Sequence, residues 1–222
     1  MKKELDERLC ADYPEIFCNR HGDMRTTAMC WGFSCGDGWY HIIDTLCGLM
    51  TSNYRSAKES YEYLTEIGVG AVRWGKTLVT QEDIDKAKAK MDEAAENVPV
   101  AMQVKEKFGG LRFYVHGGTE EHYNYINFAE SMSYRTCEVC GAPGHVYTDG
   151  WYRTLCDVHA KEEKGDKIPT APAINPNNNG NSFKACNSLL DVNVAASASS
   201  FGYWSSNAVY NGSSWTCEGD GT

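Results

Sequence analysis

Hydrophobic and polar residues alternate with two different periods along this chain, which predicts helices and strands in the same fold. Between positions 38 and 50, apolar residues recur as they do on the buried face of a helix. In 98–104 and 111–115 they recur at every second position on either side of a Lys-Phe-Gly-Gly turn, which predicts a β-hairpin. The predicted helices span residues 5–11, 38–50, 56–67, 80–97 and 120–133.

Charge divides the chain into two parts. Residues 1–169 hold 20 basic and 27 acidic residues, whereas the charged residues of 170–222 are Lys184, Asp191, Glu218 and Asp220. Prolines and an Asn-Gly run between the two parts predict a linker. We therefore expect an α+β domain over 1–133, a small module over 134–167, the linker over 168–181 and a low-charge extension rich in Ser, Asn and Gly over 182–222.

Four residues of the small module have the spacing of a zinc site. Cys137, Cys140, Cys156 and His159 form the pattern C-x2-C-x15-C-x2-H, which is typical of tetrahedral zinc with thiolate and imidazole ligands. The segment between the two pairs has room for a hairpin, and a short helix is expected at 160–164, an arrangement that resembles a treble clef or a zinc ribbon. Because four protein ligands fill the coordination sphere, we expect one structural zinc ion and not a catalytic one.

A second, looser cluster precedes it. Cys18, His21, Cys30 and Cys35 form the pattern C-x2-H-x8-C-x4-C. Their types suit a second zinc ion, but cysteine is also a common small apolar core residue. The sequence leaves both interpretations open, and buried cysteines beside an unrelated surface histidine are the simpler one.

One enzymatic interpretation starts from Gly32-Phe-Ser34-Cys-Gly36, which matches the G-x-S-x-G nucleophile motif. Ser34 would then be the nucleophile, with His116, His122 or His145 as the base. Cys35 is the alternative nucleophile, close in sequence to His41, although His41 and Asp44 more simply form a hydrogen bond on one helix face. The strand pattern does not supply the doubly wound sheet to which the motif belongs, so this interpretation is the weaker one.

The charge of the chain restricts its partners. Thirty acidic and 21 basic residues give a formal net charge of −9, so no overall positive field attracts phosphates, and nucleic acid would need a local patch. The best local patch is on the predicted hairpin, where Lys105, Lys107 and Arg112 lie near three aromatic rings. Those rings, Phe108, Phe113 and Tyr114, suit either a stacking platform for bases or an ordinary core, and the core is the simpler interpretation.

The opening of the chain and its cysteines bear on localisation. Residues 1–8 are mostly charged and lack the apolar segment of a signal peptide, and no run of about 20 apolar residues predicts a membrane span. We therefore expect no membrane association and a reducing cytosol. There, clustered cysteines are more often metal ligands or buried apolar residues than disulfides.

Four segments resemble a family of small tailed-phage and prophage proteins: CWGFSCGDGW at 30–39, DTLC at 44–47, VKEKFGGLRFY at 104–114 and SYRTCEVCGAPG at 133–144. The resemblance covers about residues 4–160. It implies a phage origin and a location in the host cytoplasm or in the virion, and it implies no activity.

The leading hypothesis is therefore a non-enzymatic, zinc-binding phage accessory protein that presents a surface to a host or phage protein or nucleic acid. A virion component that uses 170–222 for assembly or attachment is one alternative. A hydrolase or thiol enzyme that uses Ser34 or Cys35 near His41 is the other.

Overall fold

The computed structural model describes residues 1–73, 75, 77–148, 150–165, 208–210 and 215–217. The chain divides into two compact units, Met1–Ala173 and Ile174–Thr222. In the second unit, strands β7 (Ala208–Tyr210) and β8 (Trp215–Cys217) pair antiparallel. The predicted linker 168–181 lies outside the described residues, as does the predicted extension 182–222 apart from these two strands.

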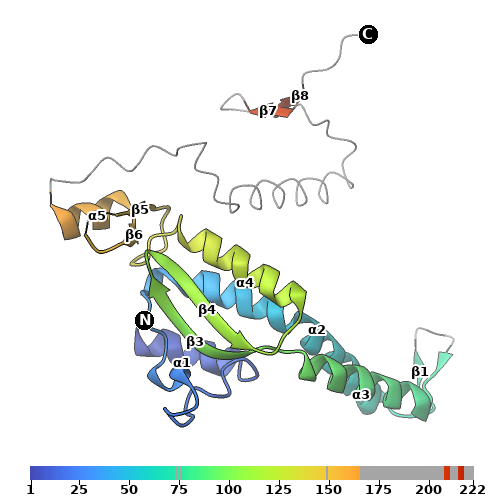
Figure 1. Cartoon of the computed structure of the whole chain (residues 1–222). Helices are drawn as coiled ribbons and strands as arrows, with labels where there is room; N and C mark the ends of the chain where they lie inside the picture. Colours follow the sequence, from blue (N-terminus) through green and yellow to red (C-terminus); the bar gives the residue numbers. More distant parts are fainter. Residues whose placement is uncertain (74, 76, 149, 166–207, 211–214, 218–222) are drawn as a thin grey trace. The chain divides into compact units, whose positions relative to one another are not determined.

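The first unit mixes helices with small antiparallel sheets, as the α+β prediction requires (Figure 1). Helix α2 packs against α3 and α4, and α4 packs against strand β4. Three features were not predicted: the short pair β1 and β2, and the single-turn 3-10 helices η1 and η2. The helices are α1 (Lys3–Asp12), η1 (Ala28–Trp31), η2 (Asp37–Trp39), α2 (Tyr40–Ile67), α3 (Gln81–Glu96), α4 (Glu120–Ser133) and α5 (Asp157–Lys164). The strands are β1 (Val72–Arg73), β2 (Thr77–Leu78), β3 (Val100–Lys107), β4 (Gly110–His116), β5 (His145–Tyr147) and β6 (Arg153–Leu155).

Helix α2 is one continuous helix, whereas the sequence predicted two, at 38–50 and 56–67. The polar residues between them do not interrupt it because they bond to the helix backbone. Thr51 is fully buried, and its hydroxyl donates to the carbonyl oxygen of Cys47 at 2.9 Å. The hydroxyl of Ser52 donates in the same way to Leu49 at 2.9 Å. A hydroxyl that donates a hydrogen bond to a carbonyl of the preceding turn does not interrupt the helix. The helix therefore continues through a polar segment that the sequence suggests is a break.

Strands β3 and β4 form the predicted hairpin, and each is longer than its apolar alternation suggested. Val104 pairs with Phe113 and Lys105 with Arg112. The backbone of Ser34 extends the sheet at the free edge of β3, since its N–H donates to Val104 and its carbonyl accepts from Glu106, at 3.0 and 2.9 Å. Segment 32–36 is therefore an extended edge and not the strand-to-helix elbow of a serine hydrolase.

The main hydrophobic core lies between the hairpin and helices α1, α2 and α4. Trp39 is at its centre and is fully buried, as are Leu9, Ile43 and Val104. All its buried members fall between Leu9 and Ala129. A separate, much smaller cluster consists of Cys137, Tyr147, Leu155 and Ala160. The first unit thus has one large core and one that is too small to fold residues 134–165 without help.

Helices α3 and α4 begin as their sequences predict. At α3, Thr80 and Asp83 form a capping box at the start of the predicted helix 80–97. At α4, the side chain of His122 takes the equivalent role, because its Nδ1 accepts from the backbone N–H of Thr119 at 3.1 Å. Only a neutral imidazole can accept this bond, and burial lowers the pKa of His122 below its ordinary value of 6.5.

The first testable prediction concerns this cap. Below about pH 6.5 the unfolded chain protonates His122 while the folded chain resists it, so the free energy of unfolding falls as the pH falls. His122→Gln keeps an accepting side chain with no charge change. We expect its free energy of unfolding, measured by urea titration at several pH values, to fall less steeply between about pH 7 and pH 5 than that of the wild type. Equal slopes in the two proteins would contradict this role.

In the part of the chain that the structure describes, no helix is both long enough and apolar enough to span a membrane.

Candidate metal centre

The four predicted zinc ligands converge in the first unit. Their candidate ligand atoms all lie within 4.8 Å of one another. Cys137 and Cys140 come from the turn after α4, Cys156 caps the N-terminus of α5, and His159 lies in its first turn. Among the residues that the structure describes, this is the only such group of three or more His, Cys, Asp or Glu side chains.

Three of the distances between the ligand atoms can be compared with those around a tetrahedral ion. With Zn–S bonds of about 2.3 Å and Zn–N bonds of about 2.05 Å, a tetrahedron places two sulfurs about 3.8 Å apart and a sulfur and a nitrogen about 3.6 Å apart. The Sγ atoms of Cys140 and Cys156 are 3.8 Å apart, and Sγ of Cys137 is 3.5 Å from Nδ1 of His159. The Sγ of Cys156 is slightly closer to the same Nδ1, at 3.2 Å. The arrangement can therefore hold one metal ion by four groups of the chain.

Backbone hydrogen bonds build the first half of the site. The N–H of Cys137 donates to Ala142 at 2.7 Å, and the N–H of Gly141 donates to Cys137 at 2.9 Å. Gly141, the residue after the second cysteine, has a φ of +79°, a backbone conformation that favours glycine. This turn, residues 137–141, is called the knuckle below.

The second half of the site is the hairpin of β5 and β6 followed by α5. The hairpin forms within the segment where it was predicted, and α5 begins three residues earlier than predicted, so that His159 is helical. The knuckle is tied to the hairpin because the N–H of Glu138 donates to Thr154 at 2.9 Å. Both pairs of ligands are thus held on elements that contact each other.

The thiols differ in how readily they ionise. The backbone N–H of His159 lowers the pKa of Cys156 to about 7, with further help from the side chains of His159 and Cys140. At Cys140 the N–H of Ala142 favours the thiolate, but burial and proton sharing with Cys137 and Cys156 outweigh it and raise the pKa. Because a bound metal requires the thiolates, Cys156 is better prepared for metal binding than Cys140.

The knuckle is clamped against the turn at residues 36–38. The N–H of Gly38 donates to the carbonyl of Glu138 at 2.8 Å, and the indole N–H of Trp39 donates to Thr136 at 2.8 Å. A Cβ on Gly38 would lie 2.1 Å from the carbonyl oxygen of Cys137. Only glycine permits this approach. The contact between residues 36–38 and the knuckle is called the glycine seam below. It explains both glycines of the GDGW segment, Gly36 and Gly38.

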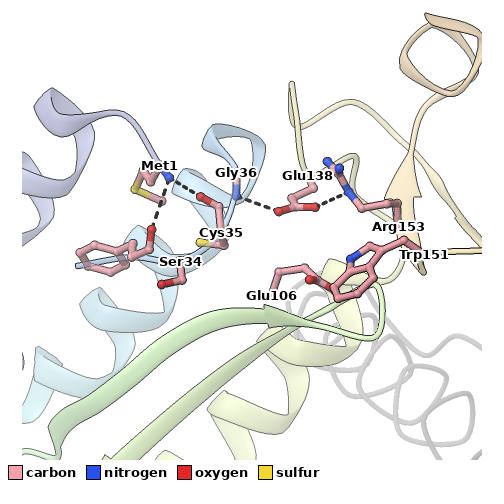
Figure 2. A pocket seen from close by; sticks show the side chains of 9 residues that line it. Met1, Ser34, Cys35, Gly36, Glu106, Glu138, Trp151 and Arg153 are labelled. Atoms are coloured by element: carbon pink, nitrogen blue, oxygen red, sulfur yellow. Dashed lines mark hydrogen bonds and ion pairs between the residues drawn. The ribbon is translucent and has the colours of Figure 1, made fainter. Parts of the chain in front are cut away.

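Glu138 strengthens the glycine seam and was not predicted. It is buried, and its carboxylate accepts from the N–H of Gly36 and from Nε of Arg153, both at 3.0 Å (Figure 2). Arg153 also contacts Glu163 on α5, with Nη1 and Oε2 3.3 Å apart. In the sequence, Glu138 is recognisable only as a charged residue between two candidate ligand cysteines. Its partner Gly36 is 102 residues away, so the sequence does not reveal the contact.

The tip of the β3–β4 hairpin contacts residues 134–165 as well. The hydroxyl of Thr154 donates to the carbonyl of Gly109 at 2.5 Å, and a Cβ on Gly110 would lie 2.3 Å from the ring of Tyr134. The segments 30–39, 104–114 and 133–144, which are far apart in the sequence, therefore meet at one place. The module of 134–165 is fastened to the main core along this junction.

The other predicted cluster does not form a metal site in the described structure. Cys18, His21, Cys30 and Cys35 are not brought together as a group of ligand atoms. The segment is held instead by Asp6 and Arg20, whose carboxylate and guanidinium groups meet at 2.8 and 3.1 Å, and Nη1 of Arg20 donates to the carbonyl of Cys30 at 3.1 Å. In the described structure an ion pair, and not a group of candidate metal ligands, organises this segment.

The candidate nucleophiles lie in unsuitable surroundings. Cys35 is buried, which raises its pKa to about 12, so its thiol does not ionise readily. A cleft beside the glycine seam is lined by Ser34 and Cys35 together with Glu106, Glu138 and Arg153 (Figure 2), and none of its described lining residues is a histidine. His41 is exposed, and the carboxylate of Asp44 accepts from the hydroxyl of Tyr13 at 2.8 Å, so the predicted His41–Asp44 hydrogen bond is not observed.

Comparison of this chain with protein-family models, with curated proteins and with solved structures found no match. The interpretation of the site therefore depends on its geometry and chemistry.

Proposed function

We propose that this protein is a non-enzymatic zinc-binding accessory protein, in which one structural zinc ion folds a small module and fastens it to an α+β domain that binds a macromolecule. The observation that supports this best is the group of three thiols and one imidazole within 4.8 Å of one another, in which two of the distances are close to those of a tetrahedron. Sulfur and imidazole ligands in this geometry favour zinc over magnesium or calcium, which prefer oxygen.

The number of ligands argues for a structural role. A catalytic zinc ion keeps one position for water or substrate, whereas a structural ion is bound by four protein groups. Here the chain supplies all four ligands. The knuckle, the β5–β6 hairpin and α5 follow one another as in a treble clef or zinc ribbon, and the module's own core of four buried residues is small enough to need the metal.

The phage origin in this proposal rests on the resemblance of the four sequence segments. A phage accessory protein acts in the host cytoplasm or in the virion on host or phage macromolecules. Under this proposal the metal centre shapes a binding surface and takes no part in a reaction.

Metal stoichiometry tests the proposal. We expect native mass spectrometry and elemental analysis of the purified chain to give one zinc ion per chain, and Cys156→Ser to lose it. Cys18→Ser is the matched control, because Cys18 is exposed and lies outside the ligand group, and it is expected to keep the ion. A chain without zinc, or equal loss from both variants, would contradict the proposal.

A further inference from the structure

The outward face of the β3–β4 hairpin combines cations with aromatic rings. Val104 and Phe113 form a buried pair on one side of the hairpin. Side chains alternate along a strand, so the neighbouring pair of Lys105 and Arg112 lies on the opposite side. Lys105, Lys107, Phe108, Arg112 and Tyr114 are called the hairpin face below.

Phe108 has a backbone conformation that is unfavourable for a bulky side chain. Lys107 pairs with Gly110, so Phe108 and Gly109 form a two-residue loop, and both have positive φ, +54° and +78°. Such loops prefer asparagine followed by glycine, because a bulky residue at positive φ costs energy. The phenylalanine ring is nevertheless 64% exposed, with its edge near the ring of Tyr152 at a centroid distance of 6.4 Å. Neither turn geometry nor core burial explains an aromatic residue here.

The ammonium groups of the two lysines of the hairpin face lie near aromatic rings and not near carboxylates. The Nζ of Lys105 lies 5.6 Å from the ring centre of Tyr114, and Nζ of Lys107 lies 5.3 Å from that of Phe108. Within the described part of the chain, no carboxylate pairs with either lysine. Arg112 is different, because it lies 3.6 Å from Glu130 and donates to the hydroxyl of Tyr134. Two unneutralised cations therefore stand beside exposed rings on a protein of net charge −9.

We propose that the hairpin face binds single-stranded nucleic acid. Lys105 and Lys107 would contact phosphates, while unpaired bases stack on the rings of Phe108 and Tyr114, which are 64% and 42% exposed. Duplex bases are already stacked on one another, so exposed rings favour a single strand. Arg112 contributes less, because Glu130 already neutralises it. The inference rests on the proposed function, since it names the surface and the partner of the fold that the metal holds together.

Titration of the zinc-loaded full chain into fluorescently labelled oligothymidine and oligouridine, with anisotropy as the signal, tests this proposal. We expect saturable binding at low salt that weakens as salt rises, and weaker binding to a duplex of the same length. Lys105→Ala with Lys107→Ala should reduce the slope of log K against log salt by about 1.4, from two phosphate contacts at about 0.7 each. The matched control is Lys86→Ala with Lys88→Ala, which removes the same charge from lysines paired with Glu82 and Asp92 and should leave binding unchanged.

Phe108→Asn separates binding from folding. Asparagine suits the positive φ of the loop, so the variant should fold at least as stably as the wild type, while its dissociation constant for oligothymidine rises roughly 5- to 100-fold from the loss of one stacking ring. Zinc content is measured on every sample. If a chain that holds zinc binds neither oligonucleotide, the inference is overturned and the metal centre stands. The same conclusion follows if the chain binds the duplex as tightly as the single strand, or if Phe108→Asn binds as tightly as the wild type. Binding by a chain without zinc would instead count against the proposed metal centre alone.

Discussion

Removal of the metal is expected to unfold residues 134–165 and to leave the rest of the first unit folded. Hydrogen exchange followed by mass spectrometry, before and after treatment with a strong chelator, measures this directly. Amides of the knuckle, the β5–β6 hairpin and α5 should lose their protection. Those of α2, β3 and α4 should keep it.

The difference follows from the two hydrophobic clusters. All the buried members of the large cluster lie between Leu9 and Ala129, so that core does not use the module. The module's own cluster has four buried members, one of which is the candidate ligand Cys137. Structural zinc contributes on the order of 10 kcal/mol or more to the folding of small zinc modules at neutral pH. Four buried residues cannot replace that contribution.

Re-addition of zinc is the control, and it should restore protection in 134–165. Two results would contradict the prediction. If protection is unchanged after the metal has been removed, the ion is not structural. If the helices and the main hairpin lose protection together with the module, the two parts fold as one unit and the metal stabilises the whole.

Gly38→Ala is expected to cause the largest loss of stability of any single-methyl change at the glycine seam. The new Cβ would lie 2.1 Å from the carbonyl oxygen of Cys137 and 2.4 Å from the backbone nitrogen of Gly141. Both are backbone atoms of the knuckle and cannot rotate away, so the knuckle must move and its hydrogen bond from Gly38 to Glu138 is lost. We expect a loss of at least about 3 kcal/mol in the free energy of unfolding.

Gly48→Ala is the matched control for this prediction. Gly48 lies inside α2, and a Cβ there would meet only the hydroxyl of Tyr13 at an ordinary 3.5 Å. Alanine is the better helix former, so this variant should gain about 0.5–1 kcal/mol. Thermal unfolding of both variants, followed by circular dichroism, checks the pair. Equal melting temperatures for Gly38→Ala and the wild type would show that residues 36–38 do not clamp the knuckle.

Local patterns in the sequence were enough for most of the secondary structure. Helix α4 spans the predicted residues 120–133, and α3 begins at the start of the predicted helix 80–97, where Thr80 and Asp83 form a cap that depends on residues three positions apart. The hairpin followed from alternation on either side of a glycine turn. The four candidate metal ligands were identified for the same reason, since the members of each pair are three positions apart and one turn of backbone brings them together.

The tertiary structure alone decided how these pieces are joined. Glu138 holds Gly36 across 102 residues, and Asp6 with Arg20 holds the segment for which the sequence left a second zinc ion open. The hydrogen bond from Thr51 to the backbone of α2 lets this helix continue through a polar segment where the sequence suggested a break. Spacing in a sequence reports which groups are neighbours along the backbone. Whether distant groups meet depends on how the main core packs, and no local pattern records that packing.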